Sequence, residues 1–351
     1  MNNKNKRIGV FGAGAVGSYI GGLLSKADYN ITLIDPWDSH VQEIQQSGLR
    51  IVGPAGDFVQ HMKALHLSDA QSITDPFDII FLSVKSYDTE WAAHFAKRFL
   101  SNNGVMLSAQ NCMNDLLVAS IVGHDREIPC VISGFAVALT EPGKVIRRQE
   151  PEGGGHKVFR VGELHGKITP RVEEIVEMLT HVDGAYATQN IWGERWSKLT
   201  LNAGSNPVMA ITGFGAQGLA ENPSARKLYI QIGKESVQVG QALDYQIEPI
   251  NGIPAEVWAR ADEGDALEEL DAVIETRGDP ENWRSSMAQD IDKGRKTEVN
   301  QMNGYIVEKG MEVGIATPVN EAVVKLITDI ESGKVKPDPS HADRILGANR
   351  L

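Results

Sequence analysis

The sequence has little cysteine, no excess of positive charge and no long apolar run, and each absence excludes a class of protein. The two cysteines, Cys112 and Cys130, lie in apolar surroundings without the spacing of metal ligands, which favours buried thiols in a reducing compartment. A formal charge of −12 argues against nucleic acid or an anionic membrane surface as the main partner. No stretch is apolar enough for a signal peptide or a membrane span, so we expect a soluble, cytoplasmic protein.

The length and the composition indicate a globular protein of two domains. The 351 residues are too many for one ordinary core, and 42% of them are hydrophobic, with neither a low-complexity tract nor an internal repeat. Strand-like and helix-like segments alternate in the first half, whereas only helical periodicity follows from about residue 190. We therefore predict a first domain over residues 1–188, a helical domain over 189–331 and a tail of uncertain order over 332–351.

A glycine-rich turn near the start of the chain is the first candidate for a binding site. It follows the short apolar strand of residues 8–11 and opens a helix, with the sequence Gly12-Ala13-Gly14-Ala15-Val16-Gly17. In such a turn Gly12 makes the tight bend, Gly14 lets the backbone approach a pyrophosphate, and Gly17 allows the helix to pack closely on the strand. The helix N-terminus offers its N–H groups and the positive end of its dipole to phosphates. The turn therefore predicts a dinucleotide-binding site.

Asp35 ends a second apolar run, residues 31–35, about 20 residues after this turn. A carboxylate at this place accepts hydrogen bonds from the ribose hydroxyls of NAD, whereas the 2′-phosphate of NADP would bring like charge against it. No Lys or Arg lies between Lys26 and Arg50. Two alternatives remain. Asp35 merely caps the turn at Pro36, or the loop belongs to a methyltransferase, whose glycine-rich loop usually lacks the third glycine.

Three further apolar runs, residues 78–84, 104–109 and 129–139, predict strands of a sheet that is buried on both faces. Helical segments separate the strands, and this alternation is typical of a doubly wound parallel sheet. Ligands of such sheets bind beyond the carboxyl ends of the strands. Four residues stand at those expected ends and become candidates for the site: Gly12, Lys85, Asn111 and Leu139.

The helical half contains a polar cluster within an otherwise apolar helix. Lys198, Asn202 and Asn206 recur every four residues, so one helix face carries an ammonium and two amides. A lone Lys on a helix is usually solvated, but two Asn residues, which form helices poorly, indicate a polar site.

A second polar cluster lies further along the helical half, in Ser285-Ser286-Met-Ala-Gln-Asp290 and again at Thr297-Glu298. Its simplest interpretation is structural, because Thr297 would cap a helix with Glu298 in the favourable first turn. The spacing alone leaves a structural and a functional role equally open.

Seven short motifs follow one another along the chain: Gly12-Ala-Gly-Ala-Val-Gly17, Ser83-Val-Lys85-Ser-Tyr, Gln110-Asn111-Cys-Met, Lys198-Leu-Thr-Leu-Asn202-Ala-Gly-Ser-Asn206-Pro, Ser285-Ser286-Met-Ala-Gln-Asp290, Gly294-Arg-Lys-Thr-Glu298 and Thr317-Pro-Val-Asn320. Over about residues 7 to 330 this ordered set resembles the ketopantoate reductase (2-dehydropantoate 2-reductase) family. The resemblance implies an N-terminal α/β Rossmann domain with a doubly wound, mostly parallel sheet, and an all-helical C-terminal domain of the 6-phosphogluconate dehydrogenase type. It also implies reduction of a 2-keto acid with a nicotinamide cofactor.

The resemblance implies roles for residues of the helical domain. Lys198 matches the family's proton donor, and an ammonium there would stabilise and then protonate the oxygen of the reduced ketone. Asn202 and Asn206 match residues that hold the substrate, and Ser286 matches a hydroxyl that binds its carboxylate. Glu298 matches a carboxylate near the lysine and the nicotinamide ribose, so it is a candidate for both catalysis and cofactor binding. No metal is implied, because lysine supplies the electrophile.

In the first domain, the turn of residues 12–17 and Asp35 are cofactor candidates from the pattern itself, and the resemblance adds Lys85. Asn111 matches a cofactor contact and is also a candidate for the substrate site. The backbone at Leu139 aligns with one more cofactor contact. A homodimer is expected from the family alone.

The departures from the family bear on the cofactor and the substrate. Members that use NADPH carry a basic residue where this chain has Asp-Pro-Trp-Asp at 35–38, so we expect NADH rather than NADPH. Cys112 stands where the family commonly has Gly, and residues 212–218 lack an Asn that some members use on the substrate. A glycine-rich insertion at 153–155 and the C-terminal tail are longer than usual.

The leading hypothesis is a 2-dehydropantoate 2-reductase-like enzyme that transfers hydride from NADH to C2 of a 2-keto acid. An NAD-dependent D-2-hydroxyacid dehydrogenase of the same family is the first alternative. The second is a non-catalytic dinucleotide sensor, and Lys198 and Glu298 argue against it because a sensor needs no proton donor.

Overall fold

A computed structural model describes residues 3–151, 155–279 and 281–348. The chain forms two compact units, residues 1–191 and 192–351. Among the described residues, the first unit contains the strands and the helices α1 to α5, and the second is helical. Of the glycine-rich insertion, residues 153 and 154 lie outside the described residues.

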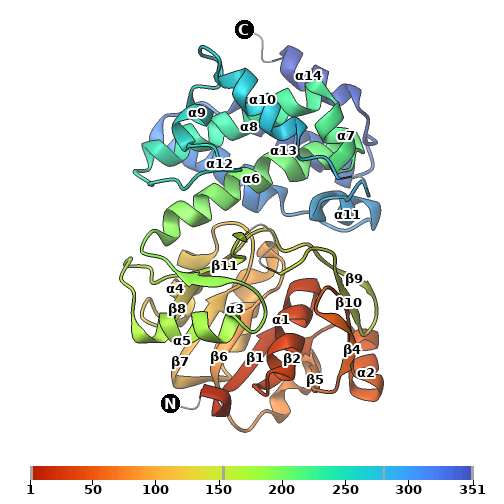
Figure 1. The fold of residues 1–351 in the computed structure, drawn as a ribbon, viewed down its shortest axis with the longest axis vertical. Helices are drawn as coiled ribbons and strands as arrows, with labels where there is room; N and C mark the ends of the chain where they lie inside the picture. The colour runs from red at the N-terminus through yellow and green to blue at the C-terminus, as the bar shows by residue number, and fades with distance from the viewer. Residues whose placement is uncertain (1–2, 152–154, 280, 349–351) are drawn as a thin grey trace. The chain divides into compact units, whose positions relative to one another are not determined.

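The first unit is built on an eight-stranded sheet with the strand order β12-β11-β8-β7-β6-β1-β2-β5 (Figure 1). Neighbouring strands are parallel except β11, which is antiparallel to β8. This mostly parallel sheet confirms the predicted fold class. Its strands are β1 Arg7–Phe11, β2 Asn30–Asp35, β5 Lys63–His66, β6 Phe77–Leu82, β7 Leu100–Ser108, β8 Glu127–Ile132, β11 Phe159–Val161 and β12 Ala185–Ala187.

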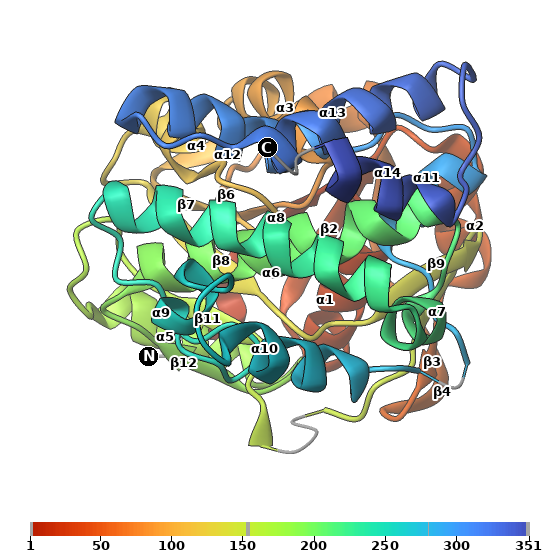
Figure 2. The ribbon, with the colours of Figure 1, turned by 90° about the horizontal axis from the view of Figure 1, so that it is seen from above.

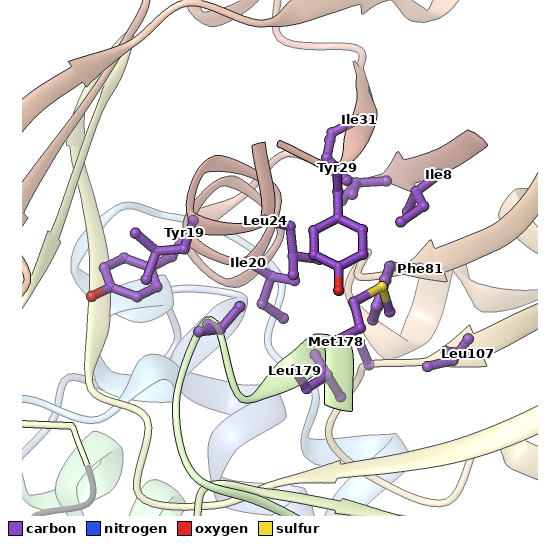
Figure 3. Close-up of a cluster of buried hydrophobic side chains, with 14 of the residues drawn as sticks. Ile8, Tyr19, Ile20, Leu24, Tyr29, Ile31, Phe81, Leu107, Met178 and Leu179 are labelled. Atoms are coloured by element: carbon purple, nitrogen blue, oxygen red, sulfur yellow. The ribbon is translucent and has the colours of Figure 1, made fainter. Parts of the chain in front are cut away.

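Helices cover both faces of this sheet, which explains why its strands read as continuous apolar runs. Along β6, Ile79 and Phe81 belong to the core on one face, and Ile80 and Leu82 belong to the core on the other. On the first face, Ile20 and Leu24 of α1 lie beside Met178 and Leu179 of α5 (Figure 3). The other face is covered by α3 and α4. The helices are α1 Ala15–Lys26, α2 Asp38–Ser47, α3 Thr89–Lys97, α4 Asp115–Val122 and α5 Pro170–Leu179, with 3-10 turns η1 Asn3–Asn5, η2 Leu67–Ser72 and η3 Ser86–Asp88.

A second, four-stranded sheet corrects the prediction for residues 129–139. The apolar run is not one strand, because the chain leaves the main sheet after Ile132, turns at Gly134 with φ +71°, and enters the other sheet at Val137. Leu139 therefore pairs with Val145 and does not end a strand of the main sheet. An apolar run records burial, and burial continues when a chain passes between two covered sheets. The strands, in sheet order, are β4 Gly56–Gln60, β3 Leu49–Gly53, β10 Lys144–Arg147 and β9 Val137–Glu141.

The second unit is organised around α8, which α7, α9, α10, α12, α13 and α14 all contact (Figure 2). The helix α6 also packs on α8, where the Trp196 indole donates to the Ser236 carbonyl at 2.9 Å. At Gly204 a Cβ would lie 2.0 Å from the Tyr229 ring, so only glycine allows this approach. The helices are α6 Ile191–Thr212, α7 Ala216–Glu221, α8 Pro223–Ala242, α9 Ala255–Ala259, α10 Ala266–Glu275, α11 Ser286–Asp292, α12 Val299–Val313, α13 Pro318–Glu331 and α14 Ser340–Ala348.

The expected tail of uncertain order contains a packed helix. In α14, His341, Ala342 and Ile345 are buried, and the helix contacts α8 and α13. The preceding segment is also held, because the Asp338 N–H donates to the Ile211 carbonyl at 2.9 Å. Proline and charge dominate residues 332–339 and hide the short amphipathic helix that follows them.

Candidate active site

The glycine-rich turn has the geometry that its sequence predicts. Gly12 has φ +96° and its N–H donates to the Ile34 carbonyl at 2.9 Å. A Cβ at Gly17 would lie 2.1 Å from the Gly12 carbonyl oxygen, so the helix packs too closely for any other residue. At Gly14, by contrast, a Cβ would meet no atom of the described residues within 4 Å. Gly14 is also the N-cap of α1, so open space lies in front of a helix N-terminus, which fits a pyrophosphate.

Ser83 joins the turn to the neighbouring strand at the point where the strand order reverses. The strand β1 lies between β2 and β6, and ligands of doubly wound sheets bind at such a point. The Ser83 N–H donates to the Phe11 carbonyl at 2.9 Å, and its hydroxyl donates to the Gly12 carbonyl at 2.7 Å. No role was predicted for Ser83, although it is the first residue of a motif.

The loops after β6 and β7 bring Lys85 and Asn111 to the same edge of the sheet. The Ser86 hydroxyl donates to the Asn111 carbonyl at 3.2 Å, and the Asn114 amide donates to the same oxygen at 2.8 Å. The Gln110 amide ties the loops together a second time through the Val84 carbonyl at 2.9 Å. Lys85 and Asn111 are half-buried. Among the predicted cofactor residues, Leu139 does not lie at this edge of the main sheet, because it belongs to β9 of the other sheet.

Asp35 ends β2 and is 9% exposed. Its Oδ1 accepts the Trp37 N–H at 2.8 Å, so the carboxylate does cap the turn at Pro36. Its Oδ2 has no hydrogen-bond partner among the described residues. Capping and ribose binding are therefore compatible, because the two roles use different oxygens.

His40 of α2 is a buried contact of the turn that sequence reasoning missed. Its Nδ1 accepts the Gly143 N–H at 2.9 Å, and its Nε2 lies 3.1 Å from the Ser18 hydroxyl. That hydroxyl donates to the Ala13 carbonyl at 2.7 Å, so it accepts from Nε2 and the imidazole is neutral. Burial lowers the pKa of His40, although the negative charge of Asp35 acts to raise it. The only sequence signal was its place on the buried face of α2.

The polar face of α6 exists as predicted, since Lys198, Asn202 and Asn206 all lie within this helix. Asn202 and Asn206 are each 7% exposed, and Lys198 is half-buried. Buried amides on a helix are unusual unless they have polar partners.

Side chains of α12 and of the N-cap of α11 contact the backbone of α6 next to these residues. The Ser285 hydroxyl, the N-cap of α11, donates to the Asn206 carbonyl at 3.1 Å, which places neighbouring Ser286 at the same end of α6. The Asn303 amide of α12 donates to the Ala203 carbonyl at 3.0 Å. The structure thus brings the start of α11 and the second turn of α12 to residues 203–206 of α6.

Glu298 is 5% exposed and occupies the N-cap of α12 itself, which corrects the interpretation that Thr297 is the cap. The Thr297 hydroxyl accepts the Val299 N–H at 3.3 Å, while the Thr297 N–H donates to the Glu331 carboxylate at 2.7 Å. A negative charge at this position interacts favourably with the helix dipole. A pairing of Glu298 with Lys198 stays a prediction.

Within residues 3–151, 155–279 and 281–348, no three His, Cys, Asp or Glu side chains gather in a way that could hold a metal ion. In the same ranges no helix combines the length and the apolar character that crossing a membrane requires. Cys112 and Cys130 are both buried.

Comparison with known proteins identifies the family. A model described as ketopantoate reductase PanE/ApbA matches residues 8–156, and its C-terminal counterpart matches residues 190–331. The chain belongs to the ketopantoate reductase family. It is 29% identical to the 2-dehydropantoate 2-reductase of Archaeoglobus fulgidus over 330 residues, which are 93% of this chain and 99% of that protein. The corresponding protein of Pyrococcus horikoshii is 27% identical over 327 residues, 93% of this chain and 98% of that protein.

Solved structures agree with this assignment. A ketopantoate reductase of the PanE/ApbA family from Ralstonia eutropha superposes with a TM-score of 0.77 at 25% identity, covering 93% of this chain and 99% of that chain. A D-mandelate dehydrogenase in ternary complex with NADH and anilino(oxo)acetate superposes with a TM-score of 0.78 at 23% identity, covering 94% of this chain and 100% of that chain. This second likeness is one of fold. The protein is thus an oxidoreductase of the ketopantoate reductase family.

Proposed function

We propose that this ketopantoate reductase family member reduces C2 of a 2-keto acid with NADH, and that ketopantoate is the first substrate to test. The observation that carries the proposal is the open backbone at Gly14, beside an acidic residue at the end of β2. This combination is suited to a dinucleotide with an unphosphorylated ribose. The named activity of the archaeal relatives, 2-dehydropantoate 2-reductase, supports the substrate.

The residues that would hold the dinucleotide all belong to the first unit. The backbone of residues 12–17 receives the pyrophosphate, and Asp35 Oδ2 receives a ribose hydroxyl. Lys85 and Asn111 contact the cofactor from the loops after β6 and β7. When bound, the nicotinamide supplies a hydride.

The helical unit supplies the proton and the substrate contacts. Lys198 stabilises the charge that develops on the ketone oxygen and then protonates that oxygen. Asn202 and Asn206 orient the keto acid, and the Ser286 hydroxyl binds its carboxylate. Glu298 keeps the lysine charged and oriented by its own negative charge. We place the enzyme in the cytoplasm as a homodimer, which sedimentation would test.

The deciding experiment compares initial rates with ketopantoate at matched NADH and NADPH concentrations, for the wild type and for Asp35→Arg. We expect NADH to be clearly better in the wild type and the substitution to shift the preference toward NADPH. Turnover with other 2-keto acids but not ketopantoate would instead support a D-2-hydroxyacid dehydrogenase. Inactivity with every 2-keto acid would leave the dinucleotide sensor.

A further inference from the structure

Proline inside α6 leaves a backbone carbonyl without its helical donor. Pro207 has no N–H, so it cannot donate to the Ala203 carbonyl four residues earlier. Ala203 is completely buried, so its oxygen is not exposed to bulk solvent. A buried carbonyl that loses its donor destabilises the protein unless another group donates to it.

Asn303 of α12 supplies the missing donor. Its amide nitrogen lies 3.0 Å from the Ala203 oxygen, and the side chain is completely buried. The amide oxygen of Asn303 has no hydrogen-bond partner among the described residues. Asn303 therefore acts at this position as a donor of two hydrogen bonds, and its amide oxygen accepts none from the described residues.

Two further side chains determine the orientation of the Asn303 amide. Its second N–H donates to the Asn320 amide oxygen at 3.0 Å. The Asn320 amide nitrogen in turn donates to Glu235 at 2.7 Å, and the Asn320 backbone N–H reaches the same carboxylate oxygen at 2.9 Å. Because the Glu235 carboxylate oxygens accept from the Val319 N–H and from both N–H groups of Asn320, Glu235 orients Asn320, and Asn320 orients Asn303.

The carbonyl that Asn303 holds lies in the same turn as the polar face of α6. Ala203 follows Asn202 directly, and the Asn206 carbonyl is held by the Ser285 hydroxyl at 3.1 Å. Side chains from two other helices thus replace or supplement the backbone bonds of residues 203–207. The amides of Asn202 and Asn206 depend on the conformation of this turn.

We propose that Asn303 is a positioning residue, which fixes the proline-containing turn of α6 and thereby aims Asn202 and Asn206 at the carboxylate and carbonyl of a 2-keto acid. The identity of this ligand rests on the proposed function, whereas the hydrogen-bond replacement does not. A merely structural Asn303 would contribute stability and leave the affinity for the keto acid unchanged. A positioning Asn303 contributes to both.

The test is a double-mutant cycle with Asn303→Ala and Pro207→Ala, because alanine at 207 restores an N–H that can reach the Ala203 carbonyl. We expect Asn303→Ala to raise KM for the keto acid about tenfold or more, with the Kd for NADH within about twofold. In the Pro207→Ala background the same substitution should raise KM much less. Asn300→Ala, an exposed position of the same helix, is the matched control.

Equal effects of Asn303→Ala in both backgrounds would overturn the proposal, as would a loss of stability without a change in KM. Asn303→Ser is the milder second variant should alanine prevent folding, because a hydroxyl can donate to only one of the two acceptors. Urea unfolding of the same four proteins gives a readout that needs no substrate. If no 2-keto acid is reduced by the wild type, the proposed function fails, and coupled stabilities would still support the hydrogen-bond replacement.

Discussion

The turn of residues 12–17 in the first unit and the turn of residues 203–207 in the second are held in opposite ways. The first depends mainly on its own backbone, because Gly12 adopts φ +96° and Gly17 admits the Gly12 carbonyl, and the Ser83 and Ser18 hydroxyls add support. The second depends on side chains about 80 to 115 residues later in the chain, at Ser285, Asn303 and Asn320. A site built by local backbone geometry can be recognised in a sequence, whereas a site built by distant side chains cannot.

The largest effect is expected from a substitution of Lys198, which should change the rate of reduction but not the binding of NADH. Lys198→Ala should lower kcat about a thousandfold, because the ketone oxygen loses both its proton donor and the positive charge that stabilises its developing negative charge. The Kd for NADH should stay within about threefold, since the cofactor residues lie in the first unit. Stopped-flow rates and fluorescence titration measure the two quantities. Unchanged turnover with normal NADH binding would exclude Lys198 as the donor and favour the sensor.

A pair of alanine substitutions tests how far the first turn depends on the close approach of its own backbone. Gly17→Ala places a Cβ against the Gly12 carbonyl and should destabilise the turn by about 3 kcal/mol or more. Gly14→Ala has open space and should leave the unfolding free energy within about 1 kcal/mol, while NADH binding weakens about tenfold. Thermal unfolding with and without NADH distinguishes them. Similar stabilities of the two variants would contradict this account of the turn.

The smallest effect is expected on the pH dependence of stability and concerns His40, which supports the first turn through the Ser18 hydroxyl. Burial lowers the pKa of His40 below the 6.5 of an unfolded histidine, so below pH 6.5 the unfolded chain binds a proton first. Stability that is present above pH 6.5 is therefore lost as the pH falls. Between pH 7.5 and 5.5 we expect a loss of about 1 kcal/mol that His40→Gln does not show, measured by urea unfolding. A loss of equal size in the variant would assign it to other groups.

The predictable part of the molecule follows from short-range rules. Strands buried on both faces, the glycine turn and the four-residue spacing on α6 were all visible because each is a local pattern. Leu139 was misplaced because an apolar run does not record a change of sheet, and α14 was missed behind a proline-rich segment. Ser83, His40 and Asn303 received no role because their partners lie 71, 22 and 100 residues away in the sequence.

The packing of α14 has a consequence for the order in which the protein forms during synthesis. The first unit is a continuous stretch ending at residue 191, so its sheet can assemble while the rest of the chain is still on the ribosome. In the second unit, α6 is made before the other helices, yet its Ile211 carbonyl is bound by Asp338 and its neighbour α8 is covered by α14, so both contacts come from residues 338–348. The helical unit therefore completes its fold only once residues 338–348 have been added, and a truncation after residue 331 would remove both the Asp338 bond and the packing of α14.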